Sequence, residues 1–157
     1  MTPDPVQVGS ALQELRAHAQ AMPPVVAMGF QIDDYNGVTL DMHAPLDANV
    51  NDKGTAFGGS MTSLMTFSGW ALVMLQLRLA GTQADVFVAD SEVRYRSPVI
   101  AELRAQAWLA PEQSWAMFFA ALAERGRARI QIQAHMLNPE GTPAATLSAR
   151  YVAIAKR

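Results

Sequence analysis

The chain has 157 residues, of which 50% are apolar and 17% charged, and this composition predicts one folded domain with a well-filled core. The formal net charge of −2 argues against a sequence-independent nucleic-acid binder, because such proteins need a basic face. The absence of cysteine excludes disulfides, thiolate metal sites and a cysteine nucleophile.

The N-terminal segment MTPDPVQVGS has prolines and an aspartate where a signal peptide would have positive charge and then an apolar core. It does not indicate export, so we expect a cytoplasmic location. Ser10 is a suitable N-cap for ALQELRAHAQAM, which is predicted to be a helix that ends before Pro23-Pro24. We interpret residues 1–24 as a peripheral helix and turn of a single domain over residues 1–157.

Two strand-like segments, MGFQIDDY and GVTLDMHA, flank Asn36-Gly37, which is a signal for a type I′ hairpin. The polar loop PLDANVNDKGT then leads to TAFGGSMTSLMTFSGW and a long helix that ends near Gly81. Residues 61–77 carry no charge, which is at the lower limit for a membrane span. They include several hydroxyl and amide side chains, so we favour a buried helix over a membrane span.

After this helix the apolar residues recur with a period of two. In VFVADSEVRYRSPV, one face is predicted to carry Phe87, Ala89, Ser91, Val93 and Tyr95, and the other Val88, Asp90, Glu92, Arg94 and Arg96. ELRAQAWLA, RARIQIQAHML and AATLSARYVAIA are also predicted strands, with PEGT as a hairpin turn between the last two. PEQSWAMFFAALAERG is predicted to be a helix with acidic residues in its first turn and Gly126 as its C-terminal stop.

The long central helix decides the fold class, because it is apolar on nearly its whole circumference and must be enclosed by protein. Six strands are available to enclose it. We therefore expect an α+β fold in which an antiparallel sheet of about six strands wraps around the central helix.

This arrangement resembles the hotdog fold, and the residues at the helix start resemble the YiiD C-terminal-like thioesterases. The resemblance covers about residues 29–154. It is carried by four motifs, which are Thr55-Ala56-Phe57-Gly58-Gly59-Ser60, Gly69-Trp70, Tyr95 with Pro98, and Gly126-Arg127-Ala128-Arg129. The resemblance implies hydrolysis of acyl thioesters of coenzyme A or acyl carrier protein, in a homodimer or a dimer of dimers with sites between subunits.

The Gly-Gly turn has a physical role that fits this chemistry. The first backbone N–H groups of a helix have no internal partner and carry the positive end of the helix dipole. At Gly58 and Gly59 no side chain prevents a thioester carbonyl from approaching, so these groups could stabilise the oxyanion. We expect the substrate to contact Phe57, Gly58, Gly59, Ser60 and Ser63. The alternatives are that the glycines only form a tight turn and that Ser60 is a helix cap.

The sequence departs from related hotdog thioesterases at two positions. Phe57 stands where a histidine is common, and the helix has no carboxylate about two turns in, where several relatives have one to activate water. Thr66 can hold a water molecule there but is a negligible base. Asn51 could orient water or the thioester, although turn formation is the favoured role of a residue in this loop.

Asp90 is the candidate for the missing base, because aspartate is disfavoured within strands. A partly desolvated Asp90 beside the central helix, near the partner's Gly58-Gly59 turn, could activate water. The alternative pairs Asp90 with Arg94 or Arg96 in an ion pair.

The remaining polar residues suggest no further chemistry. His18, His43 and His135 are expected to have structural or surface roles, and we expect no metal and no cofactor. Arg94, Arg96, Arg127 and Arg129 could meet coenzyme A phosphates, but alternating charges on strand faces are usually solvated or paired. Because the helix lacks a carboxylate, a module that binds acyl thioesters or acyl chains without hydrolysis remains the second hypothesis. A dehydratase would need a histidine that Phe57 replaces.

Overall fold

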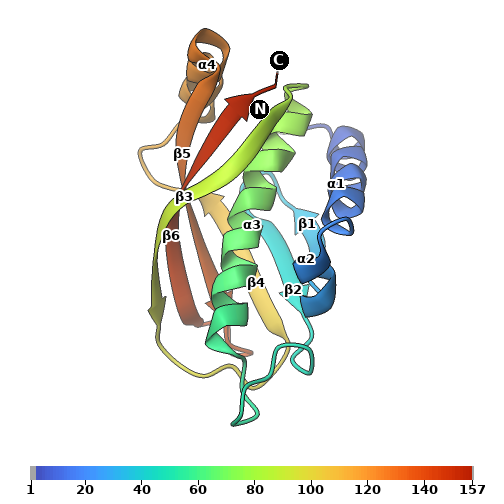
Figure 1. Ribbon diagram of the computed structural model, residues 1–157, viewed down its shortest axis with the longest axis vertical. Helices are drawn as coiled ribbons and strands as arrows, with labels where there is room; N and C mark the ends of the chain where they lie inside the picture. The colour runs from blue at the N-terminus through green and yellow to red at the C-terminus, as the bar shows by residue number, and fades with distance from the viewer. Residues whose placement is uncertain (1–2, 157) are drawn as a thin grey trace.

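The computed structural model describes residues 3–156, which form four helices and six strands (Figure 1). In chain order these are α1 Pro5–Ala19, α2 Pro23–Met28, β1 Gln31–Tyr35, β2 Leu40–Ala44, α3 Gly58–Leu79, β3 Ala84–Tyr95, β4 Leu103–Leu109, α4 Trp115–Arg125, β5 Arg127–Leu137 and β6 Pro143–Ala155.

The six strands form one sheet in the order β1-β2-β4-β5-β6-β3, and all neighbouring strands are antiparallel. Helix α3 lies along one face of this sheet and contacts every strand from β2 to β6, while α1 packs beside α3 and also contacts β1 (Figure 1). The α+β class and the six-stranded sheet around a long helix, which were predicted as a hotdog fold, are confirmed.

Helix α3 is enclosed as its apolar composition predicts. Twelve of its 22 residues are buried, and side chains such as Leu64, Met65, Leu72 and Leu75 are almost completely inaccessible. They pack in one cluster with the inward-facing residues of the sheet, which on β5 are Ala128, Ile130, Ile132, Ala134 and Met136. Within residues 3–156, no helix has the length and apolarity needed to cross a membrane.

The N-terminal part of the chain differs from the prediction in two ways. Helix α1 begins at Pro5, six residues earlier than expected, because the Asp4 carboxylate caps it by accepting from the Val6 N–H at 3.0 Å. Ser10 is therefore an interior residue. The helix also buries Leu12 and Leu15 in the main core, so it is an integral part of the packing. The second difference is that Pro23 begins another helix, α2, which contains Met28 of the expected first strand.

The turns differ in detail from the predictions. Asn36-Gly37 does lie between β1 and β2, but only Gly37 has a positive φ, whereas a type I′ turn needs two such residues. Asn36 instead accepts from the N–H groups of Val38 and Thr39. Helix α4 begins at Trp115 with Ser114 as its N-cap, so its first turn contains no acidic residue.

A bulge in β3 changes the predicted faces of that strand. Val88 pairs with Tyr151 of β6 and Asp90 pairs with Arg150, so Ala89 has no partner in the ladder. Val88 therefore shares the helix-facing side with Tyr151, whereas Asp90 points to the opposite face. The prediction that Val88 and Asp90 share a face is wrong, because one extra residue shifts the alternation by one position.

Candidate functional site

The loop before α3 is held in place by buried backbone contacts. The Asn49 amide donates to the carbonyl oxygens of Met28 and Pro45, both at 2.8 Å, and the Asn49 carbonyl accepts from the Phe57 N–H at 2.7 Å. The Ala56 N–H donates to the Val99 carbonyl at 2.7 Å. These contacts fix the point at which α3 begins.

Asn51 organises the same loop and does not reach the central helix. Its side-chain oxygen accepts from the N–H groups of Lys53 and Thr55, and its amide donates to the Thr55 hydroxyl at 2.7 Å. All of these contacts lie within five residues of chain, which is the pattern of an Asx turn. The structure therefore supports the turn-forming role that was favoured for Asn51.

The first turn of α3 has backbone N–H groups without an acceptor among the described residues. Gly58, Gly59 and Ser60 precede the first intrahelical donor, Met61, whose N–H bonds to the Phe57 carbonyl at 3.0 Å, and their own N–H groups have no acceptor within residues 3–156. Neither glycine has a positive φ, so they are not needed for a left-handed turn. At Gly59 the need is space, because an added Cβ would lie 2.5 Å from Cε2 of the Phe57 ring.

Tyr95, at the end of β3, ties the strand to this turn. Its hydroxyl donates to the Gly58 carbonyl at 3.0 Å and is also hydrogen-bonded to the Thr62 hydroxyl. Gly58, Thr62 and Thr66 are spaced by four residues and so lie along one side of the helix. Tyr95 therefore lies on the side of α3 that carries Gly58, Thr62 and Thr66.

An apolar cleft of about 370 Å³ runs along this side of α3. Helix α3 contributes hydroxyl groups near its start and an aromatic pair further on, since the rings of Phe67 and Trp70 stack with centroids 5.1 Å apart. The Trp70 indole N–H donates to the Val86 carbonyl at 3.1 Å, which fixes the ring against β3. The cleft is lined by Met22, Val25, Met28, Phe30, Thr62, Ser63, Thr66, Phe67, Trp70, Val88 and Tyr151.

Tyr151 forms the floor of the cleft. Its hydroxyl donates to the Thr66 carbonyl at 2.7 Å, and burial raises the pKa of the phenol above its ordinary value, so the hydroxyl keeps the proton that it donates. The ring lies so close to α3 that a Cβ at Gly69 would be 2.7 Å from its Cζ atom. Gly69 is thus the residue that allows the helix and the sheet to meet here.

The predicted site residues divide into two groups. Ser63 and Thr66 line the cleft, and Phe57, Gly58 and Gly59 lie at the helix start one turn before it, with Ser60 buried beside them. Asp90 lies elsewhere. Its carboxylate pairs with Arg150 on the sheet face away from α3, and its side chain is 58% exposed. Within one chain the structure thus supports the ion-pair alternative, with Arg150 in place of Arg94 or Arg96.

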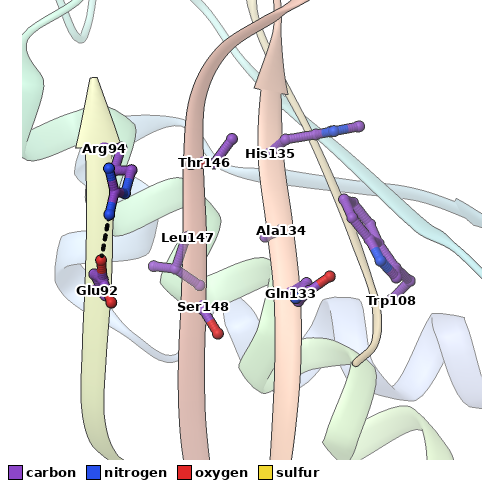
Figure 2. Close-up of a pocket in the computed structure, with 9 residues that line it drawn as sticks. All are labelled: Glu92, Arg94, Trp108, Gln133, Ala134, His135, Thr146, Leu147 and Ser148. Carbon is purple, nitrogen blue, oxygen red and sulfur yellow. Dashed lines mark hydrogen bonds and ion pairs between the residues drawn. The ribbon is translucent and has the colours of Figure 1, made fainter. Parts of the chain in front are cut away.

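None of the three histidines lines the cleft. His43 bonds to Asp33 at 2.7 Å, and His18 contacts Arg78 and the edge of the Trp70 ring. His135 packs edge-on against Trp108 on the sheet face away from α3 (Figure 2). Its Nε2 atom is 2.8 Å from the Gln106 side-chain oxygen, and burial lowers its pKa.

On the same sheet face, Glu92 and Arg94 form an ion pair beside a shallow hollow (Figure 2). Within residues 3–156 no three His, Asp or Glu side chains gather closely enough to hold a metal ion.

Several cleft residues were not identified from the sequence. Met22, Val25 and Met28 were missed because α2 was not predicted, although Pro23-Pro24 is a usable helix-start signal. Tyr151 was assigned only to a strand. A glycine within a buried helix indicates a close neighbour, so Gly69 was the signal that could have led to it.

Comparisons with known proteins agree with this architecture. A protein of unknown function from Chlorobaculum tepidum TLS is 30% identical, with a TM-score of 0.86 and coverage of 99% of this chain and 98% of the other. A structure from Shewanella oneidensis, described as a “putative thioesterase”, is 26% identical with a TM-score of 0.82, covering 93% and 99%. A thioesterase from Haemophilus influenzae shares the fold at 16% identity and a TM-score of 0.70, covering 92% and 90%. Residues 12–155 match the family described as “Putative thioesterase (yiiD_Cterm)”, and the chain therefore belongs to this family.

Proposed function

We propose that the protein hydrolyses acyl thioesters of coenzyme A or acyl carrier protein, with the acyl group in the cleft beside α3. The observation that carries this proposal is that the cleft lies along α3 directly after the first turn of the helix. Thr62, Ser63 and Thr66 line the cleft, and the unpaired N–H groups of Gly58 and Gly59 lie on the preceding turn. A thioester bridges two such regions, since its acyl chain is apolar and its carbonyl is polar.

The proposed reaction places the thioester carbonyl oxygen at the first turn of α3. The N–H groups there would stabilise the negative charge that develops when water attacks the carbonyl carbon. The C–S bond then breaks, the acyl group leaves as a carboxylic acid, and the second proton of the water passes to the departing thiolate. Ser63 and Thr66 hold hydroxyl groups at the cleft and are the candidates for positioning the water.

The cleft favours an acyl group without charge. Most of its lining is aliphatic, aromatic or thioether, and its volume falls within the range of small-molecule sites. The aromatic pair of Phe67 and Trp70 and the flexible methionines Met22 and Met28 offer surfaces to alkyl and aromatic groups alike.

A binding module that does not hydrolyse the thioester is the second candidate. One observation favours it, which is that the described residues lining the cleft include no histidine, aspartate or glutamate. A general base would therefore come from another subunit or from solution. Asp90, which pairs with Arg150 within its own chain, can be tested as a base from another subunit with the Asp90→Asn variant.

A hydrolysis screen across acyl-CoA chain lengths, paired with calorimetric binding of the same compounds, separates the two candidates. We expect turnover that falls ~10-fold or more in Thr66→Val, which keeps the shape of the side chain and removes its hydroxyl. Thr146→Val, on β6 outside the cleft, is the matched control. Saturable binding without turnover would support the binding module, and the absence of both would refute the use of this cleft for acyl groups.

We further propose that the protein is a homodimer, or a dimer of dimers, and that it is cytoplasmic. Strand β3 is an edge of the sheet, is 12 residues long and exposes 56% of Phe87 and 47% of Val88. A long unprotected edge is a template for pairing with a second copy. Sedimentation at micromolar concentration should show a dimer that Phe87→Lys weakens, and a monomeric parent protein would contradict the proposal.

A further inference from the structure

A second hollow lies between α4 and the first residues of β5, and arginines dominate its lining. Its volume is about 550 Å³. Arg125 reaches it from the last turn of α4, and Arg127 and Arg129 reach it from β5. Helix α4 lies at the end of the molecule opposite the first turn of α3, so the hollow is separate from the cleft of the same chain (Figure 1).

These three arginines differ from most others in the protein. Arg78, Arg94, Arg104 and Arg150 each pair with a carboxylate, and Arg16 donates to backbone carbonyls. Within residues 3–156, Arg125, Arg127 and Arg129 have neither kind of partner, and neither does Arg96, which lies outside the hollow.

Glu112 is the one carboxylate in the lining, and it forms no ion pair with the three guanidinium groups. The hollow therefore carries a net positive charge in a chain whose net charge is −2.

The composition of the hollow fits a phosphate ester. Guanidinium groups bind phosphate oxygens through paired, charge-assisted hydrogen bonds, and three such groups around one hollow match the charge of a phosphate that carries two charges. Gln113 adds a side-chain amide, whose oxygen already accepts from the Gln131 N–H at 3.0 Å, so its NH₂ group is left to donate. Met117, which is 74% exposed, offers an apolar surface on the same rim.

We propose that this hollow binds the phosphate groups of a nucleotide, with the arginines on the phosphate and Met117 against the base. Its concave shape and volume suit a small ligand better than the broad face of a protein partner. The nucleotide could be free or could be the adenosine 3′,5′-bisphosphate part of coenzyme A, and both present the same chemistry to the arginines. The proposal does not rest on thioester hydrolysis, because none of its residues lines the cleft.

Calorimetric titration of the full chain with adenosine 3′,5′-bisphosphate, ADP, coenzyme A and pantetheine tests the proposal. We expect saturable binding of the three phosphate compounds, weakening with added salt, and none of pantetheine in this hollow. Arg127→Gln/Arg129→Gln should raise the Kd at least ~10-fold, the scale of a lost charge-assisted hydrogen bond.

The matched control is Arg94→Gln/Arg104→Gln, which removes the same charge from two ion-paired arginines on the outer sheet face. It should leave the Kd within about twofold of the parent. Tighter binding of coenzyme A than of ADP would identify the coenzyme as the source, and equal binding would identify free nucleotides. Undetectable binding at millimolar concentration, or equal losses in the two double variants, would overturn the proposal.

Discussion

The contact between Gly69 and Tyr151 predicts that adding one methyl group to α3 destabilises the protein. In Gly69→Ala the new Cβ would lie 2.7 Å from Cζ and 2.9 Å from Cε2 of the Tyr151 ring, too close for either atom to remain in place. Overpacking of this kind costs about 1–3 kcal/mol. Displacing the ring also weakens the hydrogen bond from its hydroxyl to the Thr66 carbonyl, which contributes about 0.5–1.5 kcal/mol.

The intrinsic helix preference of alanine over glycine opposes this loss by about 1 kcal/mol. We therefore expect a net loss of about 0.5–3.5 kcal/mol in the free energy of unfolding. Urea denaturation followed by circular dichroism, at one protein concentration, measures this quantity.

Gly9→Ala is the matched control for this experiment. Gly9 lies within α1 and a Cβ there meets no atom within 4 Å, so the same substitution should stabilise the protein by up to about 1 kcal/mol. The two variants should therefore change stability in opposite directions. If Gly69→Ala were as stable as the parent or more so, the close packing of Tyr151 on α3 would not exist as described.

Three further predictions concern the site and its surroundings. Gly59→Val should abolish thioester turnover with its secondary structure retained, because the branched side chain occupies the carbonyl position and displaces Phe57; a folded variant with the parental rate would refute carbonyl binding there. Asp90→Asn should keep kcat within threefold of the parent and lower the free energy of unfolding by at most about 1 kcal/mol, because Asp90 faces away from α3 and pairs with Arg150. A ~10²-fold fall in kcat would instead establish Asp90 as a base from another subunit. Burial lowers the pKa of His135 in the folded protein, so the unfolded chain takes up the proton first and the Tm should fall as the pH drops below about 6.5. His135→Gln should reduce this fall in Tm, and an unchanged pH dependence of Tm in the variant would contradict the prediction.

The fold was predictable because its two strongest patterns are long. Helix α3 is apolar on all sides, and β5 alternates over 11 residues, so a helix enclosed by a sheet was the simplest solution. The bulge at Ala89 was not predictable, because a single unpaired residue leaves no mark in a period-two pattern. Helix α2 was missed for a similar reason, since its six residues are too few to show a helical period.

The site was only partly predictable from the sequence. The Gly58-Gly59 turn could be recognised from local chemistry, because the unpaired N–H groups of a helix start follow from its position in the chain. The cleft could not, since its walls come from α2, α3, β3 and β6, and Tyr151 follows Gly69 by more than 80 residues. Asp90 was considered catalytic on the basis of a face that the bulge reverses.

The bulge at Ala89 also has a consequence for how β3 tolerates change in length. Val88 and Tyr95 are seven positions apart, and an odd separation in a regular strand would send them to opposite faces. The extra residue restores the parity, so one strand can line the cleft with Val88 and also hold the start of α3 with Tyr95. Deleting Ala89 itself would remove the bulge and leave the two side chains six positions apart on one face, whereas deleting one paired residue between them, such as Ser91, would keep the bulge and turn one of them away from α3. Losing two paired residues between them would preserve the parity and shorten the strand by about 7 Å, which moves Tyr95 along the helix.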